Sequence, residues 1–524
     1  MVAALEENER SATFGWDLSS AADATGLDDP ASCSVAPMHS LSPYDPDAME
    51  PTRERRDGAD GGGGFPWADL RPTGVSWNAS GYSLAVSYGR FDVTGWCDSP
   101  GALCVWNLRR ADVDPGRPHV VMETSSCLQC VAFHPTNPGV VAAGSLDGEV
   151  MVWDLAVADG VDAKVKVGGV PAGGADGGVP RGAERGKGGA PKMGDALIGK
   201  SEVSDASHRE PVTCVGWMRS SNGQVTAGPL EKVGTGAHDD GGDDYELVSA
   251  GGDGRVLVWD ASDASHPAYG YELASANEGG SGAMTTWGVS SAAFSPTCAR
   301  HGVGGLEPGS FYAGSDGGPV FRCKTSHSRS RSRTTREFRD KLRDSGVAPP
   351  MYSPVKQTHD GHKGATHAVC VNPHDARVFA TCGGDGALRV YTRYASGGVV
   401  SATPAPGALF AASWSPTRPA LIACGGVGGR VCLYDLTATG GEDVQPTEQF
   451  RACDAGTDVQ AIAFNSALPE YLATADARFV RVWELGAGLT TERAGERRVI
   501  DAIAGAETAV EAAAALDAAK ASRR

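Results

Sequence analysis

A short motif that returns seven times constrains the fold of this chain more than any other feature. Each copy holds an apolar strand, a tight turn rich in Gly and Asp, and a second apolar strand that ends in an aromatic residue. The clearest copy, residues 247–260, reads LVSAGGDGRVLVWD. One such repeat cannot bury both faces of its small sheet, whereas several repeats arranged in a ring can. The pattern therefore predicts an all-β, seven-bladed propeller.

The spacing of the closing aromatic residues sets the limits of this propeller. Three of the gaps between them are close to the 40–45 residues of a WD40 repeat, and the other three require insertions. The closing residues are Trp106, Trp153, Trp259, Phe321, Tyr391, Tyr434 and Trp483. We expect a WD40 propeller over 67–487, with rim insertions at 156–207, 219–243 and 324–350. A tail poor in apolar clusters, 1–66, is expected to be disordered, and an Ala-rich tail, 488–524, to be partly helical.

Four polar residue types recur in the best-formed repeats. An Asp lies six residues before the closing aromatic, a Ser or Thr lies four residues before that Asp, and a His lies further upstream. Buried polar groups must be paired, so we expect a hydrogen-bonded chain of aromatic residue, Ser or Thr, His and Asp that fixes the turn. Its members would be His208, Ser249, Asp253 and Trp259 in repeat three, His362, Thr381, Asp385 and Tyr391 in repeat five, and Asp147 and Trp153 in repeat two.

These polar residues are interpreted as structural and not as catalytic, because nothing nucleophilic is placed beside them. The remaining repeats lack the full set. Repeat six carries Val427 near the Asp position, and repeat seven reads TADAR over 474–478. We expect these blades to depend on apolar packing alone.

Charge and hydropathy exclude several classes of protein. The net charge of −18 argues against a general binder of nucleic acid or of membrane surfaces. No apolar run reaches 18 residues, and the first ten residues do not resemble a secretion signal. The 13 cysteines lie mostly in strand-like apolar runs, which predicts reduced thiols in a cytosolic protein.

Three motifs could carry chemistry, and none predicts a cofactor or a metal. Residues 194–201, GDALIGKS, match the phosphate-binding pattern GxxxxGK[ST], but the Gly- and Pro-rich run before them cannot form the strand that such a loop requires. The pair Cys127 and Cys130 lacks the second pair that a structural zinc site uses. The Arg/Ser-rich loop 328–343 is interpreted as a solvated insertion, with an acidic protein partner or phosphorylation as functional alternatives.

The first repeat also carries a specific resemblance. Residues 74–110 contain the strings SWN, YGR and VWNLRR, and 132–155 and 410–419 add further matches. This pattern resembles the dynein intermediate chains, most closely those of cytoplasmic dynein 2, the dynein of intraflagellar transport. The resemblance covers roughly residues 70–487.

The resemblance implies a non-enzymatic subunit that docks on the tail of a dynein heavy chain beside a second, different intermediate chain. It also implies residence in the cytoplasm, on the cytoskeleton, and in the cilium or at its base. Family members hold dynein light chains through an N-terminal arm, but no K/R-x-T-Q-T-like segment precedes residue 67 here, and the one similar string is Lys356–Thr358. Light-chain binding therefore stays open.

Three other functions remain as alternatives. An axonemal dynein intermediate chain is a near neighbour of the favoured interpretation. A substrate receptor of a cullin ubiquitin ligase is suggested by Trp106-Asn107-Leu108-Arg109, which is close to the W-D-x-R string of such receptors. An ATP- or GTP-hydrolysing enzyme would depend on residues 194–201 alone.

Overall fold

The computed structural model describes most of the propeller and both of its flanks. The described residues are 33–43, 67–92, 99–110, 113–158, 196–219, 245–261, 264–276, 284–294, 309–325, 351–402, 406–438, 444–453 and 456–523. The segment 328–343, predicted to be a basic loop, lies outside them, as do 1–32, 44–66 and most of the three predicted insertions.

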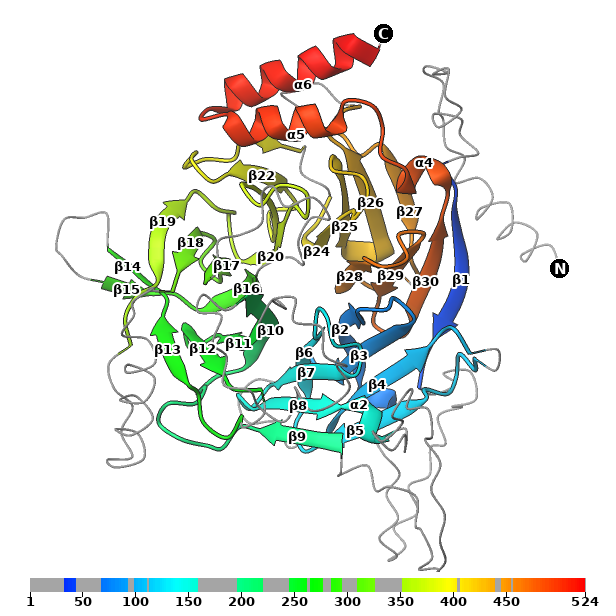
Figure 1. The fold of residues 1–524 in the computed structure, drawn as a ribbon, viewed down its shortest axis with the longest axis vertical. Coiled ribbons are helices and arrows are strands. Elements are labelled where there is room, and N and C mark those ends of the chain that lie inside the picture. Colours follow the sequence, from blue (N-terminus) through cyan, green and yellow to red (C-terminus); the bar gives the residue numbers. More distant parts are fainter. Residues whose placement is uncertain are drawn as a thin grey trace, which may run out of the picture.

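Within the described residues, seven four-stranded antiparallel sheets stand around a ring (Figure 1). Blade 1 consists of β2 (Arg71–Trp77), β3 (Ser83–Gly89), β4 (Gly101–Asn107) and β5 (Val120–Thr124). Blade 2 consists of β6 (Leu128–Phe133), β7 (Val140–Ser145), β8 (Val150–Asp154) and β9 (Leu197–Lys200). Blade 3 consists of β10 (Val212–Arg219), β11 (Tyr245–Gly251), β12 (Arg255–Trp259) and β13 (Tyr269–Glu272). Blade 4 consists of β16 (Val289–Ala293), β17 (Ser310–Ser315), β18 (Val320–Lys324) and β19 (Val355–His359). Blade 5 consists of β20 (Thr366–Val371), β21 (Val378–Gly383), β22 (Leu388–Thr392) and β23 (Val400–Ser401). Blade 6 consists of β24 (Leu409–Trp414), β25 (Leu421–Gly426), β26 (Arg430–Asp435) and β27 (Glu448–Arg451). Blade 7 consists of β28 (Ala461–Phe464), β29 (Tyr471–Ala475), β30 (Val480–Leu485) and β1 (Val35–Leu41).

This arrangement confirms the predicted seven-bladed WD40 propeller. The first strand of each blade contacts the first strands of its neighbours and so lines the centre of the ring. Turns between second and third strands lie on one face of the ring, which we call the Asp face. Turns between first and second strands lie on the other, which we call the cavity face. Gly148, Gly254 and Gly386 follow the turn Asp residues with φ of 86°, 75° and 73°, a conformation that glycine adopts without strain.

Ring closure departs from the prediction for the N-terminal segment. Residues 35–41 lie within the tail that was expected to be disordered, yet they form β1, the outer strand of blade 7 (Figure 1). Val35 pairs with Leu485 and Leu41 pairs with Val480. The prediction is wrong for these residues because the partner strand lies far along the chain and β1 carries no copy of the repeat motif.

The predicted insertion boundaries also shift in one place. Residues 156–207 were expected to form a loop, but Leu197–Lys200 within them form β9, the outer strand of blade 2. The short helix α2 (Leu155–Ala158) follows β8 directly. Outside the ring, β14 (Ala274–Ala276) and β15 (Met284–Thr286) form a two-stranded hairpin between blades 3 and 4.

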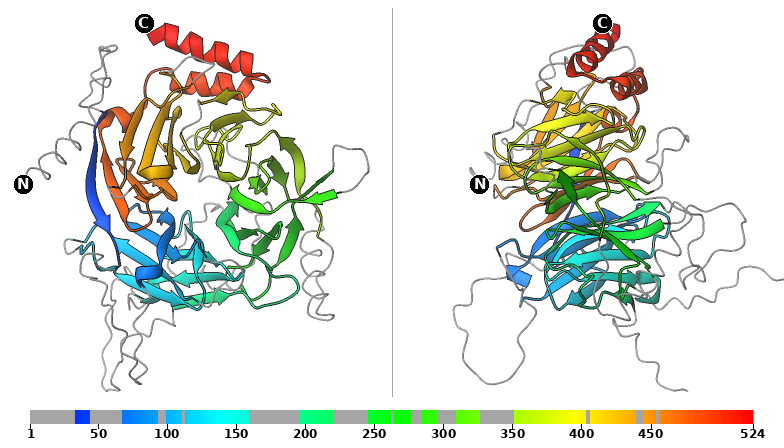
Figure 2. Two further views of the ribbon diagram at one scale, coloured as in Figure 1. Left: turned by 180° about the vertical axis from the view of Figure 1, so that it is seen from behind. Right: turned by 90° about the vertical axis from the view of Figure 1, so that its left-hand side faces the viewer.

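The C-terminal residues form helices that share the core of the propeller. After α4 (Ala487–Thr490), α5 (Glu496–Gly505) and α6 (Ala509–Arg523) lie against the outside of blades 5 and 6, at the top of Figure 1, and Figure 2 shows the same placement from two other sides. Ile500 and Ile503 of α5 are buried in one cluster with Val400 and Leu436. The outer strand of blade 5, β23, has only two residues, and the helices cover the apolar surface that a longer strand would hide. Among the described helices, none is long and apolar enough to cross a membrane.

Candidate functional site

The structure brings the four predicted residues of blade 3 into one hydrogen-bonded chain. Trp259 Nε1 lies 2.8 Å from Ser249 Oγ, Ser249 Oγ lies 2.7 Å from His208 Nε2, and His208 Nδ1 lies 3.1 Å from Asp253 Oδ1. An ionised carboxylate only accepts, so His208 Nδ1 donates and Nε2 accepts the hydroxyl proton of Ser249. All the donors in this chain therefore point toward Asp253.

Asp253 then fixes the turn and the entry of the blade. Its carboxylate accepts the backbone N–H groups of Arg209 and Arg255, at 2.9 and 3.0 Å. Burial pushes the pKa of Asp253 upward, but the hydrogen bonds from His208 and the backbone outweigh it, and the net pKa is lowered. The side chain is thus an ionised structural acceptor at neutral pH.

Blade 5 repeats this arrangement with one change. His362 Nδ1 lies 2.8 Å from Asp385 Oδ1, and His362 Nε2 lies 2.7 Å from Thr381 Oγ1. Burial lowers the pKa of His362, against the opposing effect of Asp385. For Asp385, burial acts upward, but the Lys363 N–H and His362 hold its pKa at about 2. The change is at the closing aromatic residue. Tyr391 stands where blade 3 has a Trp, and its hydroxyl donates to the backbone carbonyl of Asp360 at 2.6 Å.

Blade 2 does not assemble the same chain. Asp147 lies in the turn between β7 and β8, and Trp153 is buried at the end of β8. The hydroxyl of Ser145 accepts the N–H of Glu149 at 3.0 Å, so it is used locally. The structure places Asp147 and Trp153 where the repeat predicts, but the described hydrogen bonds do not join them through a His.

Blade 7 retains more polar structure than the prediction of apolar packing alone. Trp483 Nε1 donates to Thr474 Oγ1 at 2.9 Å, and Asp476 Oδ1 accepts the N–H groups of Arg478 and Phe479 at 2.7 and 3.0 Å. Arg481 forms an ion pair with Asp476. The prediction is wrong here because Asp476 lies seven, not six, residues before the aromatic, although Thr474 and Asp476 are both visible in the sequence.

A buried ion cluster in blade 6 was also missed. The Arg418 side chain is 1% exposed and contacts Asp435 Oδ2 at 2.5 Å, the Gly488 carbonyl at 3.0 Å, and Glu496 Oε1 at 2.9 Å from its Nε. Arg493 Nη1 lies 3.6 Å from Asp435 Oδ2. Glu496 opens α5, so the cluster fastens the C-terminal helices to the propeller.

Two of the three motifs with possible chemistry are parts of blades, and the third, 328–343, lies outside the described residues. Leu197–Lys200 of the GDALIGKS string is strand β9, Lys200 Nζ lies 2.9 Å from Glu149, and Ser201 Oγ accepts the Val150 N–H at 2.9 Å. A phosphate loop needs a helix there, so this geometry does not support nucleotide binding. Burial raises the pKa of Cys130, whose thiol faces the Val212 carbonyl at 3.4 Å. In the part of the chain that the structure describes, no cluster of His, Cys, Asp or Glu could hold a metal.

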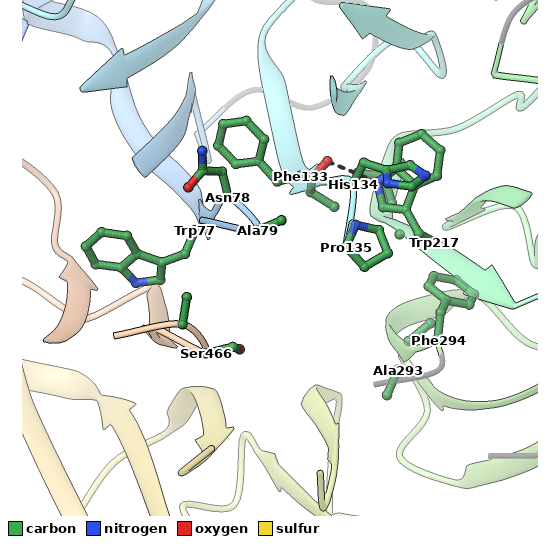
Figure 3. A pocket seen from close by; sticks show the side chains of 15 residues that line it. Trp77, Asn78, Ala79, Phe133, His134, Pro135, Trp217, Ala293, Phe294 and Ser466 are labelled. Carbon is green, nitrogen blue, oxygen red and sulfur yellow. Dashed lines mark hydrogen bonds between the residues drawn. The ribbon is translucent and has the colours of Figure 1, made fainter. Parts of the chain in front are cut away.

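A cavity of about 550 Å³ lies on the cavity face, at the ends of the innermost strands (Figure 3). Blades 1, 2, 3, 4 and 7 contribute to it. Its aromatic walls come from Trp77, Phe133, His134, Trp217 and Phe294, and smaller residues such as Ala293 and Ser466 complete it. Phe133 and Trp217 are themselves buried, and more of the exposed lining of the cavity is polar than apolar.

Comparison with known proteins supplies the family context for this geometry. Residues 100–272 match the model of the "Dynein axonemal intermediate chain 3 WD40 domain", and residues 353–392 match that of the "WD domain, G-beta repeat". The cytoplasmic dynein 2 intermediate chain 2 of Mus musculus is 29% identical over 442 residues, which is 82% of this chain and 68% of that protein.

Two further relatives agree. The human cytoplasmic dynein 2 intermediate chain 2 is 27% identical over 454 residues, covering 84% of this chain and 71% of that protein. The human dynein axonemal intermediate chain 2 is 23% identical over 442 residues, covering 83% and 56%. The predicted resemblance is confirmed, and the chain is a WD40 propeller protein related to the dynein intermediate chains.

Proposed function

We propose that this chain is a non-catalytic intermediate chain of cytoplasmic dynein 2, which docks on the heavy-chain tail and so helps to assemble the motor for retrograde intraflagellar transport. A second, different intermediate chain would bind the same tail. The protein would then work in the cytoplasm, on the cytoskeleton, and in the cilium or at its base.

The observation that carries this proposal is the length of the match to the dynein 2 intermediate chains. It extends over 442 residues in the mouse relative and 454 in the human one, which is 82% and 84% of this chain, so it is not limited to one copy of the repeat motif. The hydrogen-bonded His and Asp residues support a non-catalytic role, because their partners are all used in fixing turns.

The experiment is reconstitution from purified components. The full chain and a fragment of the dynein 2 heavy-chain tail should elute together in size-exclusion chromatography at micromolar concentration. Addition of ATP to the chain alone should release no phosphate above buffer. Separate elution of the two proteins at all concentrations tested would contradict the proposal.

An axonemal dynein intermediate chain is the second candidate, because the axonemal relative matches over a similar length of this chain, 442 residues, at the lower identity of 23%. A parallel reconstitution with an axonemal outer-arm heavy-chain tail separates the two functions. Binding to the dynein 2 tail with at least tenfold higher affinity supports the first candidate, and the reverse preference supports the second.

A further inference from the structure

The ring-closing strand β1 buries little of its own surface. Within the described residues it pairs only with β30, and a bulge interrupts this pairing between Pro37 and His39. Four of its seven residues are exposed, and only Leu41 is fully buried. Pro37 also lacks the N–H group that strand pairing uses. The stability of β1 therefore depends on what anchors its two ends.

The C-terminal end of β1 is anchored to blade 1. The N–H group of Ser42 donates to the carbonyl of Pro115, in the connection between β4 and β5, at 3.0 Å. Leu41 is buried in a cluster that also contains Leu84 and Trp106 of blade 1. This end thus contacts the blade that follows β1 in the sequence.

The N-terminal end of β1 is anchored to the C-terminal part of the chain. The N–H group of Gly486, which precedes α4, donates to the Ser34 carbonyl at 2.8 Å. Cys33 is buried in one cluster with Leu485 at the end of β30 and Leu489 of α4. Figure 1 shows α4 beside the beginning of β1. The first described residues and the segment after the last blade therefore meet here.

Arg493 connects this place to the buried ion cluster of blade 6. Its Nη2 lies 3.6 Å from Cys33 Sγ and 3.4 Å from the Gly488 carbonyl, and its Nη1 lies 3.6 Å from Asp435 Oδ2. Arg418, which pairs with the first residue of α5, donates to the same Gly488 carbonyl at 3.0 Å. The beginning of β1 and the beginning of α5 are thus joined through α4 and two guanidinium groups.

We propose that β1 and the C-terminal segment 487–523 attach to the ring as one cooperative unit. They are joined at what we call the terminal junction, which consists of Cys33–Val35, Gly486–Leu489 and Arg493. Because β1 has few buried side chains, loss of the contacts of Arg493 should release β1 as well as α5. Coupling between two elements is reciprocal, so weakening β1 should also loosen α5. A partner that binds either terminus would then change the closure of the ring.

The first test is hydrogen–deuterium exchange of the full chain, measured by mass spectrometry. Arg493→Ala removes the side-chain contacts at the terminal junction. Arg497→Ala is the matched control, because Arg497 lies in the same part of the chain and pairs with Glu492 at the surface. Exchange of residues 245–259 in blade 3 reports unfolding of the whole ring, and thermal melts check that both variants fold.

We expect Arg493→Ala to speed the exchange of residues 35–41 by at least about tenfold without a change in blade 3. Residues 496–505 of α5 should exchange faster in the same variant. Arg497→Ala should leave both segments within about twofold of the wild type. An increase in residues 35–41 of less than about threefold, with α5 loosened, would overturn the proposal.

A substitution at the opposite end of β1 provides the second test. Leu41 lies in a cluster that contains no residue of α4 or α5, so Leu41→Ala weakens β1 without altering the terminal junction. Leu84→Ala is the control, because it makes the same change in the same cluster on β3. We expect residues 496–505 to exchange at least about fivefold faster in Leu41→Ala than in Leu84→Ala.

Equal exchange of α5 in these two variants would overturn the proposal. It would mean that the helices attach independently, through apolar contacts such as those of Ile500 and Ile503. The two tests alter opposite ends of β1, so a variant that fails to fold in one of them leaves the other decisive.

Discussion

Blades 3 and 6 are stabilised by different kinds of interaction. In blade 3, Trp259, Ser249, His208 and Asp253 form a hydrogen-bonded chain, and all four lie between positions 208 and 259. In blade 6, no such chain exists in the described residues. Arg418 instead contacts Asp435 in the same blade and Glu496, 78 residues further along, on α5.

The difference shows what each arrangement can specify. A local hydrogen-bonded chain fixes one turn, and the loss of one member leaves one or two polar groups unpaired. A buried ion cluster joins separate elements, and removal of one member leaves an uncompensated charge in a dry environment. Blade 6 thus depends on the presence of the C-terminal helix, whereas blade 3 is fixed by residues within its own repeat and the preceding loop.

The largest effect should come from Arg418→Ala. This change leaves Asp435 and Glu496 buried without their partner, and we expect a loss of about 3–5 kcal/mol in the free energy of unfolding. Urea denaturation measures the loss, and limited proteolysis should show early cleavage of α5 and α6. Arg497→Ala is the control, because Arg497 pairs with Glu492 at the surface and should cost less than about 1 kcal/mol. Equal losses in the two variants would contradict the view that the cluster is structural.

The second effect is a pH dependence that arises beside the same cluster. Glu448 on β27 is buried, its Oε2 has no hydrogen-bond partner within the described residues, and burial raises its pKa to about 8, against the opposing effect of Arg493 and Arg418. The folded chain then holds a proton that the unfolded chain releases near pH 4.5, so stability falls as pH rises between these values and levels off above about pH 8. The slope from this group is up to about 1.4 kcal/mol per pH unit.

Glu448→Gln should remove this contribution and be more stable than the wild type at pH 8. Denaturation curves at pH 5, 6.5 and 8 measure the change. The other acidic groups of the cluster are Asp435 and Glu496, beside Arg418 and Arg493. Parallel slopes in the variant and the wild type would assign the pH dependence to these acidic groups and contradict the prediction.

An intermediate effect is expected for Ser249→Ala in blade 3. The hydroxyl serves both Trp259 and His208, and its removal leaves a buried indole N–H and an imidazole nitrogen unpaired, at a cost of about 1–3 kcal/mol. Tyr391→Phe in blade 5 is the comparison, because it removes one bond to a carbonyl and should cost about 0.5–1.5 kcal/mol. Thermal melts of the two variants check which one loses more stability. A larger loss for Tyr391→Phe than for Ser249→Ala would contradict this prediction.

The smallest effect should come from Lys200→Ala on β9. Its ion pair with Glu149 is 40% exposed on the lysine side, and we expect a loss of about 0.2–1 kcal/mol. Fluorescent ATP should bind neither the wild type nor the variant. Binding to the wild type that disappears in the variant would restore the interpretation of residues 194–201 as a nucleotide site.

The parts of the fold that the sequence predicts are those with local causes. The turn Asp, the following Gly and the closing aromatic residue lie within one hairpin. Asp253, Gly254 and Trp259 therefore predict a blade from the local sequence alone. His208 joins them at a distance of 45 residues because the repeat fixes where an upstream His must lie.

The remaining parts depend on partners that no local pattern specifies. A long insertion separates β9 from β8, so β9 does not lie at the spacing that the repeat predicts. Arg418 precedes a proline in a turn and resembles an exposed surface residue until Glu496 is placed beside it. The indole N–H groups of Trp77 and Trp217 donate to backbone carbonyls. Every residue has such a carbonyl, so the sequence does not indicate which one accepts the bond.

The pairing of β1 with β30 has a consequence for how the protein is made. Val35 and Leu485 lie 450 positions apart, the difference between their residue numbers. Blades 1 to 6 consist of hairpins whose strands follow one another, so they can form while the ribosome is still at work. The N-terminal strand must wait until β30 has left the ribosome. A nascent chain that stops early therefore keeps an open ring, and a partner that requires the closed ring selects finished molecules.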